Sequence, residues 1–297
     1  MVRKELLVLG FASTAVGFTL GRLASRPARE PLRVTSTLRG GAATGQGRVA
    51  VVTGGSRGIG AAVCKILAKQ GYKVVVNYRS NADMAAAVVA EIEKEGGVAV
   101  AVQADIAVEA DVQRLFAETR RLLGPVAALV NNAAIIGPRG SLTGDDAVDD
   151  WAAELRTLIE TNVVSAMGCI KEAVADMSTA RGGSGGSIVS VSSGSAMIGS
   201  PLLYGVSKGA LNSVQNGLVK ELAAQGVRIN SVAPGMTKTD MVPDDVAARN
   251  KGTIPLGRVG EPEEIAATIA FLLGDESSYT SGACIRVAGG RPMGGLQ

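Results

Sequence analysis

The sequence predicts an α/β fold in which helices cover both faces of one doubly wound, parallel β-sheet. Short runs of small and β-branched apolar residues alternate with longer amphipathic segments from Arg48 almost to the C-terminus. The runs do not alternate polar with apolar residues, which is typical of strands that are buried on both faces of a parallel sheet. A glycine-rich segment follows the first run directly. Strands separated by helices at this spacing predict a single layered domain.

The first elements form a βαβ unit. We expect a strand over residues 49–53, a helix over residues 61–70 that ends at Gly71, a favourable C-cap, and a second strand over residues 73–77. The alternation then predicts helices over residues 82–95, 109–123, 151–177, 204–224 and 262–273, and strands over residues 98–103, 127–130, 187–191, 227–232 and 283–287. Trp151, at the start of the longest helix, is expected in the core.

Composition excludes several kinds of site. None of the 297 residues is histidine, so a Ser-His-Asp triad, a His-activated cysteine and His-dependent metal sites are excluded, and no metal site is expected. Cys64, Cys169 and Cys284 are distant in sequence and odd in number, which suits a reducing compartment and small buried hydrophobic residues. After residue 48, no cluster of Lys and Arg is interleaved with aromatic residues, so nucleic acid is not expected as a partner.

The N-terminal segment differs from the rest of the chain. Residues 1–48 contain eight Lys and Arg against two Glu, so the net charge of +3 originates there. Residues 6–21 form an uncharged, largely apolar run, shorter than the roughly 20 residues of a spanning helix. The Arg-rich, acid-poor stretch over residues 22–48 is similar to organelle transit peptides. We therefore expect residues 1–46 to lie outside the fold, either as a cleaved signal for a plastid or mitochondrion or as a short membrane anchor, and residues 47–297 to form the catalytic domain.

The glycine-rich segment Thr53–Gly60 (TGGSRGIG) joins the first strand to the first helix. Glycines at such a turn let the backbone approach a pyrophosphate, and free N–H groups at the helix N-terminus then bind its charge. The position after a buried strand and before an amphipathic helix predicts a dinucleotide site. The residues expected to contact the dinucleotide here are Gly54, Ser56, Arg57, Gly58, Ile59 and Gly60.

The end of the second strand, Asn77-Tyr78-Arg79-Ser80, contains no carboxylate. A carboxylate there would accept a hydrogen bond from a ribose 2′-hydroxyl and repel a 2′-phosphate. Its absence, together with the guanidinium groups of Arg57 and Arg79, favours NADP(H) over NAD(H). Asp105, after the third strand, is expected either to contact the adenine or to cap the following helix.

Tyr204 and Lys208 lie four residues apart in a predicted helix and therefore on one face of it. A phenol with its ordinary pKa near 10 exchanges protons poorly at pH 7. A neighbouring cation and a positively charged nicotinamide ring both favour the phenolate and lower that pKa. The pair therefore suggests a proton-transfer site.

These motifs together resemble the classical short-chain dehydrogenase/reductase family over nearly all of residues 48–290. The resemblance rests on six ordered motifs, namely the loop Thr53–Gly60, Asn131-Asn132-Ala133-Ala134 where the family has NNAG, Asn162, Ser192-Ser193, Tyr204 with Lys208, and Pro234-Gly235. It implies a Rossmann fold and an NADP(H)-dependent oxidoreductase that interconverts an alcohol with a ketone or aldehyde.

The resemblance also implies roles for individual residues. Tyr204 would exchange the proton with the substrate oxygen, and Lys208 would lower the pKa of Tyr204 and bind the nicotinamide ribose. Ser193, with Ser192 as the alternative, would donate to the carbonyl, and Asn162 would hold a water of the proton relay. Further cofactor contacts would come from Asn132, Ala133, Pro234, Gly235 and Thr239.

The sequence departs from the family pattern in two places. Ala134 replaces a glycine, and the interval from Ser193 to Tyr204 is one or two residues shorter than is common, which weakens the choice of Ser193. The segment from Pro234 to Gly260 would cover the substrate, and its apolar residues suggest an apolar or amphipathic carbonyl compound. The long helices over residues 151–177 and 204–224 would form the face of a homodimer, and the C-terminus would complete a homotetramer.

Three alternatives remain open for the function. The chain is similar to 3-oxoacyl-(acyl-carrier-protein) reductases, which an organellar leader favours, and to glucose and ribitol dehydrogenase-like enzymes. A membrane-anchored lipid carbonyl reductase, with membrane contact through residues 6–21, is a second alternative. A catalytically silent dinucleotide-binding protein is a third, although such a protein would be expected to lose Tyr204 or Lys208.

Overall fold

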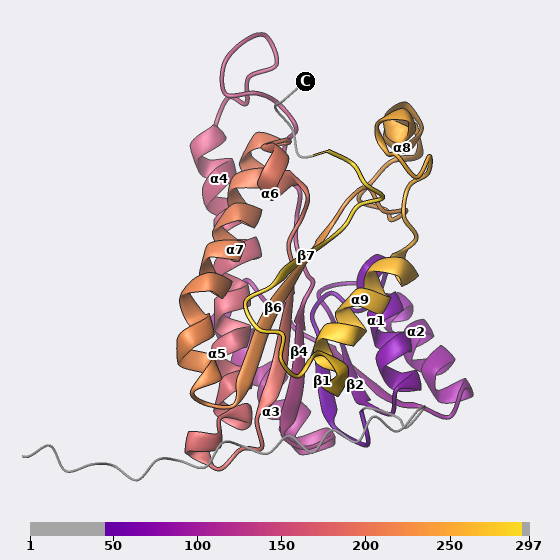
Figure 1. The fold of residues 1–297 in the computed structure, drawn as a ribbon, viewed down its shortest axis with the longest axis vertical. Coiled ribbons are helices and arrows are strands. Elements are labelled where there is room, and N and C mark those ends of the chain that lie inside the picture. Colours follow the sequence, from indigo (N-terminus) through magenta and orange to yellow (C-terminus); the bar gives the residue numbers. More distant parts are fainter. Residues whose placement is uncertain (1–44, 293–297) are drawn as a thin grey trace, which may run out of the picture. The chain divides into compact units, whose positions relative to one another are not determined.

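The computed structural model describes residues 45–292, and the expected leader lies outside the described residues except for its last two positions. One parallel sheet of seven strands forms the centre, in the order β3-β2-β1-β4-β5-β6-β7 (Figure 1). This arrangement confirms the predicted α/β class and the doubly wound sheet. The strands are β1 (Val49–Val52), β2 (Lys73–Tyr78), β3 (Val98–Gln103), β4 (Val126–Asn131), β5 (Gly186–Val191), β6 (Val227–Pro234) and β7 (Cys284–Val287).

Helices cover both faces of the sheet (Figure 1). One face carries α1 (Gly58–Lys69), α2 (Ala82–Lys94) and α9 (Pro262–Leu273). The other carries α3 (Glu109–Leu122), α5 (Ser165–Met177) and α7 (Leu202–Ala223). The helix α4 (Trp151–Ile159) packs on α7 and runs into α5 through a five-residue π-helical turn, Glu160–Val164.

The central strand β1 shows why the apolar runs lack alternation. All four of its residues are buried, with Ala50 and Val52 in the core beneath α1 and α9 and Val51 in the core beneath α3 and α5. Burying an aliphatic side chain of this size stabilises a fold by about 1.5–3 kcal/mol. A polar residue at any of these positions would therefore weaken one of the two cores.

The structure differs from the sequence-based expectations at several points. The predicted helix over residues 151–177 contains the π-helical turn, and two short helices were not predicted, α6 (Ser195–Ile198) and α8 (Asp244–Asn250). Trp151 was wrongly expected in the core: it is 44% exposed, because it begins α4 at the outer end of that helix. Cys64 and Cys169 are buried as expected, but Cys284 is exposed on the edge strand β7.

Within the described residues, no helix combines the length and the apolar character needed to cross a membrane.

Because all strands are parallel, their carboxyl ends lie at one edge of the sheet, and the loops that leave them meet there. The tightest packing at this edge surrounds Gly60, in the first turn of α1. A Cβ at this position would lie 2.2 Å from Gly54 O and 2.6 Å from Asn132 Nδ2. No side chain fits without moving the backbone of the glycine-rich loop.

We therefore expect Gly60→Ala to lower the free energy of unfolding by about 1–3 kcal/mol, the usual cost of overpacking. Urea denaturation of the purified chain measures this change. Gly217→Ala is the matched control, because a Cβ there meets nothing within 4 Å on an exposed face of α7. It should raise stability by up to about 1 kcal/mol through helix propensity. Equal stability of Gly60→Ala and the unchanged chain would contradict the packing described here.

Candidate active site

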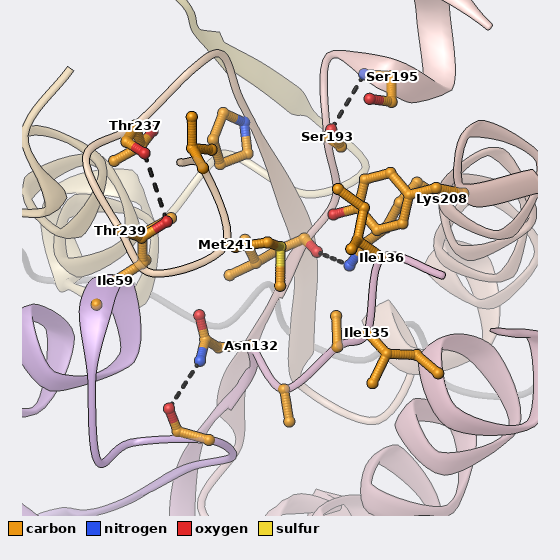
Figure 2. Close-up of a pocket in the computed structure, with 18 of the residues that line it drawn as sticks. Ile59, Asn132, Ile135, Ile136, Ser193, Ser195, Lys208, Thr237, Thr239 and Met241 are labelled. Atoms are coloured by element: carbon orange, nitrogen blue, oxygen red, sulfur yellow. Dashed lines mark hydrogen bonds between the residues drawn. The ribbon is translucent and has the colours of Figure 1, made fainter. Parts of the chain in front are cut away.

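A cavity of about 960 Å³ opens at the carboxyl edge of the sheet. The loops after all seven strands contribute residues to it. Figure 2 shows how Asn132, Ile135, Ser193, Lys208 and Thr239 approach the cavity from different segments. The cavity is large enough for a dinucleotide and a small substrate together.

The glycine-rich loop forms one wall. Gly54 and Gly58 have φ angles of +62° and +52°, which favour glycine. Ser56, Arg57 and Ile59 also line the cavity, at the N-terminus of α1, where unpaired N–H groups attract anions. Gly60, expected as a contact, does not line the cavity, because it faces the carbonyl of Gly54 beneath the loop.

Hydrogen bonds tie this loop to the end of β4. Asn132 Nδ2 donates to Thr53 O at 2.9 Å and to Gly54 O at 3.1 Å. In return, Thr53 Oγ1 accepts from the backbone N–H groups of Asn132 at 3.0 Å and Ala133 at 3.1 Å. Asn132 and Ala133, which the sequence predicts as cofactor contacts, both line the cavity. Their contacts also hold the glycine-rich loop in place.

The end of β2 adds a residue that the sequence analysis did not assign. Asn77 is buried, its Oδ1 accepts from Gly54 N at 3.3 Å, and its Nδ2 donates to Val102 O and Ala104 O on the β3 side. An asparagine fits here because it accepts from the loop and donates to the neighbouring strand at once. Its position at the end of a buried strand, beside the glycine-rich loop, is the sequence signal that could have identified Asn77 as a site residue.

Three charged residues lie at the same end of the cavity. Arg57 and Arg79 are both exposed and line it, and Arg57 Nη1 lies 3.3 Å from Asp240 Oδ2. Asp105 also lines the cavity, and its Oδ1 accepts from Ala107 N at 3.1 Å. The alternative that Asp105 caps the next helix is wrong, because the N-cap of α3 is Val108, three residues further on.

Tyr204 and Lys208 meet on the inner face of α7. Lys208 is only 2% exposed, its Nζ donates to Val191 O at 2.7 Å, and Nζ lies 5.7 Å from the centroid of the Tyr204 ring. Burial lowers the pKa of Lys208 to about 8. Burial also raises the pKa of Tyr204 to about 12, and the hydrogen bond with Ser193 opposes this rise. The sequence-based expectation that Lys208 lowers the pKa of Tyr204 is therefore wrong for the protein's own groups: burial dominates, and the opposing contribution comes from Ser193.

The two candidate serines point to different partners. Ser193 lines the cavity, interacts with Tyr204, and its Oγ accepts from Ser195 N at 3.0 Å (Figure 2). Ser192 also lines the cavity but is buried, and its Oγ lies 3.5 Å from Lys208 O, on the backbone of α7. The one-turn helix α6 fills the short interval before Tyr204. The geometry therefore favours Ser193 as the hydroxyl beside the tyrosine.

Asn162 differs from its expected position. It lies in the π-helical turn, is buried, and is not among the residues that line the cavity. Its Oδ1 accepts from Ile135 N and its Nδ2 donates to Ile135 O, both at 2.9 Å, and Nδ2 also donates to Ser207 Oγ at 3.0 Å. Both amide hydrogens are thus used. The Asn162 side chain therefore ties the segment after β4 to α7, and its role in holding a water of the proton relay stays a prediction.

The loop after β6 closes the other wall. Pro234, Gly235 and Thr239 line the cavity, and Gly235 N donates to Val287 O at 2.8 Å. Thr239 Oγ1 lies 3.4 Å from Thr237 O (Figure 2), and a Cβ on Gly58 would lie 3.1 Å from the Thr239 methyl group. The loop therefore returns over the glycine-rich loop.

Three further lining arginines, Arg139, Arg286 and Arg291, were not predicted because no local motif marks them.

The chain matches the family model described as enoyl-(acyl carrier protein) reductase over residues 54–291. It is 42% identical over 252 residues to an uncharacterised oxidoreductase, YgfF, of Escherichia coli, covering 82% of this chain and 99% of that one. It is 39% identical over 249 residues to a 3-oxoacyl-(acyl-carrier-protein) reductase of Synechocystis, covering 83% and 97% of the two chains.

Solved structures give the same result. A dehydrogenase/reductase of Sinorhizobium meliloti superposes with a TM-score of 0.76 at 33% identity, covering 84% of this chain and 98% of that one. A short-chain dehydrogenase of Burkholderia cenocepacia, in complex with NADP, superposes with a TM-score of 0.75 at 35% identity, covering 84% and 99%. The fold, the ordered motifs and these likenesses agree, and the chain is therefore an oxidoreductase of the short-chain dehydrogenase/reductase family.

Proposed function

We propose that this chain is an NADP(H)-dependent oxidoreductase that interconverts a ketone or aldehyde with an alcohol, with Tyr204 as general acid and base. The observation that carries the proposal is the convergence of the glycine-rich loop and the buried Tyr204–Lys208 pair on one cavity. Family membership supports a nicotinamide dinucleotide as the cofactor. The substrate itself is not assigned.

The cavity fits such a cofactor on its own evidence. The backbone of Gly54 and Gly58 leaves room for a pyrophosphate at the N-terminus of α1. Arg57 and Arg79 offer guanidinium groups to a 2′-phosphate, and no carboxylate ends β2 to repel it. The complex of the Burkholderia relative with NADP supports this choice.

When bound, the nicotinamide supplies or accepts the hydride at the substrate carbon. Tyr204 gives its proton to the developing oxyanion, or takes one from the alcohol, and Ser193 donates a hydrogen bond to the same oxygen. Lys208, fixed by Val191 O, provides a positive charge beside the phenol. Asn162 positions Ile135 and the start of the loop after β4.

A 3-oxoacyl-(acyl-carrier-protein) reductase of organellar fatty-acid synthesis is the alternative that the Synechocystis relative favours.

We propose further that residues 1–46 are a targeting leader or anchor outside the catalytic domain. The exposed apolar residues Val164 at the end of the π-helical turn, Met167 of α5 and Val206 of α7 support a homodimer through these helices. The presence of both Tyr204 and Lys208 in the cavity argues against a silent dinucleotide-binding protein.

We expect Tyr204→Phe to reduce turnover by at least about 100-fold, because the phenol is the proton donor. The measurement is NADPH oxidation at 340 nm with a 3-oxoacyl thioester, simple diketones and, in reverse, aldoses. NADPH affinity, measured by calorimetry, should stay within a few-fold. Tyr72→Phe is the control, since its hydroxyl bonds Leu273 O far from the cavity. Full turnover by Tyr204→Phe on an accepted substrate would overturn the proposed mechanism.

Arg79→Gln should raise the KM for NADPH about 10-fold, since one charge-assisted contact to a phosphate is lost. The KM for NADH, which has no 2′-phosphate, should barely change. Steady-state kinetics with both cofactors gives the comparison. Arg156→Gln, on the exposed surface of α4 outside the cavity, serves as the control. Equal changes for both cofactors would argue against selectivity by Arg79.

Lys208→Met should abolish turnover but stabilise the free protein at pH 7. The lowered pKa of about 8 means that burying the ammonium is unfavourable, on the order of 3 kcal/mol. The folded chain releases the proton of the Lys208 ammonium at lower pH than the unfolded chain does. The destabilisation by the buried ammonium is therefore complete below pH 8 and declines as pH rises from 8 toward 10.5.

Denaturation of the unchanged chain and of Lys208→Met at pH 7 and pH 9.5 tests this expectation. The advantage of the variant should shrink at the higher pH, below the range in which Tyr204 ionises. Lys220→Met, at an exposed position of the same helix, should show no such trend. A variant less stable than the unchanged chain at pH 7 would contradict the unfavourable burial.

A further inference from the structure

The cavity is more basic than its cofactor end alone explains. Among the described residues that line it, only Asp105 and Asp240 are acidic. Asp240 is already paired with Arg57, and Asp105 accepts from a backbone N–H. The basic lining residues are Arg57, Arg79, Arg139, Lys208, Arg286 and Arg291.

Apart from Lys208 of the catalytic pair, these basic residues fall into two groups according to the strand order. Arg57 and Arg79 follow β1 and β2, at the end of the sheet where the proposed cofactor would place its adenosine phosphates. Arg139 follows β4, Arg286 lies on β7 and Arg291 follows β7, all on the opposite side of the crevice between β1 and β4. The second group is therefore available to the substrate.

None of the three substrate-side arginines has a carboxylate partner among residues 45–292. Arg139 Nη2 donates to Met241 O at 3.2 Å, in the loop expected to cover the substrate. Arg286 Nη2 donates to Arg291 O at 2.6 Å, while its Nε is buried without a hydrogen-bond partner. Guanidinium groups without a carboxylate partner bind carboxylates and phosphates strongly. This end of the cavity is thus complementary to an anion.

The cavity also has apolar lining residues. Ile135, Ile136, Ile198, Met236, Val242 and Val246 line the same cavity. The side chains of Ile135 and Ile136 enter it from the segment after β4, near Lys208 (Figure 2). A wholly polar substrate would leave these residues in contact with water and gain little from burial.

We infer that the substrate is an anionic amphipath: an apolar body bearing the carbonyl or alcohol group, and a terminal carboxylate or phosphate bound by Arg139 and Arg291. The inference rests on the proposed function for the reacting group. The anion site itself does not require turnover. Arg286 holds the backbone of Arg291 and so positions the C-terminal segment against the cavity.

The test is calorimetric titration of the full chain, without cofactor, with octanoate, octyl phosphate and 1-octanol. At least one anion should bind about 10-fold more tightly than octanol, the usual gain from one charge-assisted pair. Arg139→Gln and Arg291→Gln should each weaken that anion about 10-fold and leave octanol unchanged. The preferred anion identifies the terminal group as carboxylate or phosphate.

Arg249→Gln is the matched control, because Arg249 lies on α8, pairs with Asp245 of the same helix and does not line the cavity. It should leave all three affinities unchanged. The inference would be overturned if octanol bound as tightly as both anions. It would also be overturned if the variants at Arg139 and Arg291 bound the anion normally and Arg79→Gln lost it.

Turnover separates this inference from the proposed function. NADPH oxidation with the methyl ester of an oxo acid, at the same efficiency as with the free acid, would leave the reductase proposal intact and overturn the anionic substrate. Conversely, octanoate could bind in a way that depends on Arg139 and Arg291 while none of the carbonyl compounds supports NADPH oxidation. That result would sustain the anion site and overturn the reductase proposal.

Discussion

The parallel pairing of β1 with β4 is the constraint on which the site depends. Val52 lies beside Val130 at the carboxyl ends of these strands, and Thr53 N donates to Val130 O at 3.0 Å just beyond them. From this point β1 continues into α1 on one face of the sheet, whereas the chain after β4 turns toward α4 and α7 on the other. Such a divergence opens a crevice at the carboxyl edge of a doubly wound sheet. Thr53 and Asn132 fasten its two sides together.

The second determinant is the burial of the tyrosine and the lysine. Lys208 is held by a single backbone carbonyl, and both side chains have pKa values shifted toward their neutral forms. A charged group in such surroundings is unfavourable unless an opposite charge or a polarising ligand arrives. The charged forms of Tyr204 and Lys208 are therefore unfavourable in the free protein, and a bound cofactor and substrate can make them less so. Stability is lower at this position for the sake of function, a common compromise in enzymes.

The sequence was sufficient for the class of fold and the strand positions, and the predicted site residues line the cavity with the exceptions of Gly60 and Asn162. Continuous apolar runs and glycine punctuation are local signals, so β3 and α9 were predicted with the observed bounds. Features that arise from packing between distant segments were not predictable. Trp151 lies outside the core because of where α4 begins, and the amide of Asn162 bonds Ile135 and Ser207 and does not line the cavity. Arg139, Arg286 and Arg291 line one cavity only because of the tertiary fold.

We expect burial to keep Tyr204 neutral until a positively charged nicotinamide shares its surroundings. Tyrosinate absorbance near 295 nm, taken as the difference between the unchanged chain and Tyr204→Phe, follows this one phenol as pH rises. We expect no ionisation of Tyr204 up to about pH 10.5 in the free chain, since its pKa is raised to about 12. With saturating NADP⁺, we expect ionisation below pH 10. Ionisation of Tyr204 at or below pH 10 without cofactor would show that burial does not keep the phenol neutral.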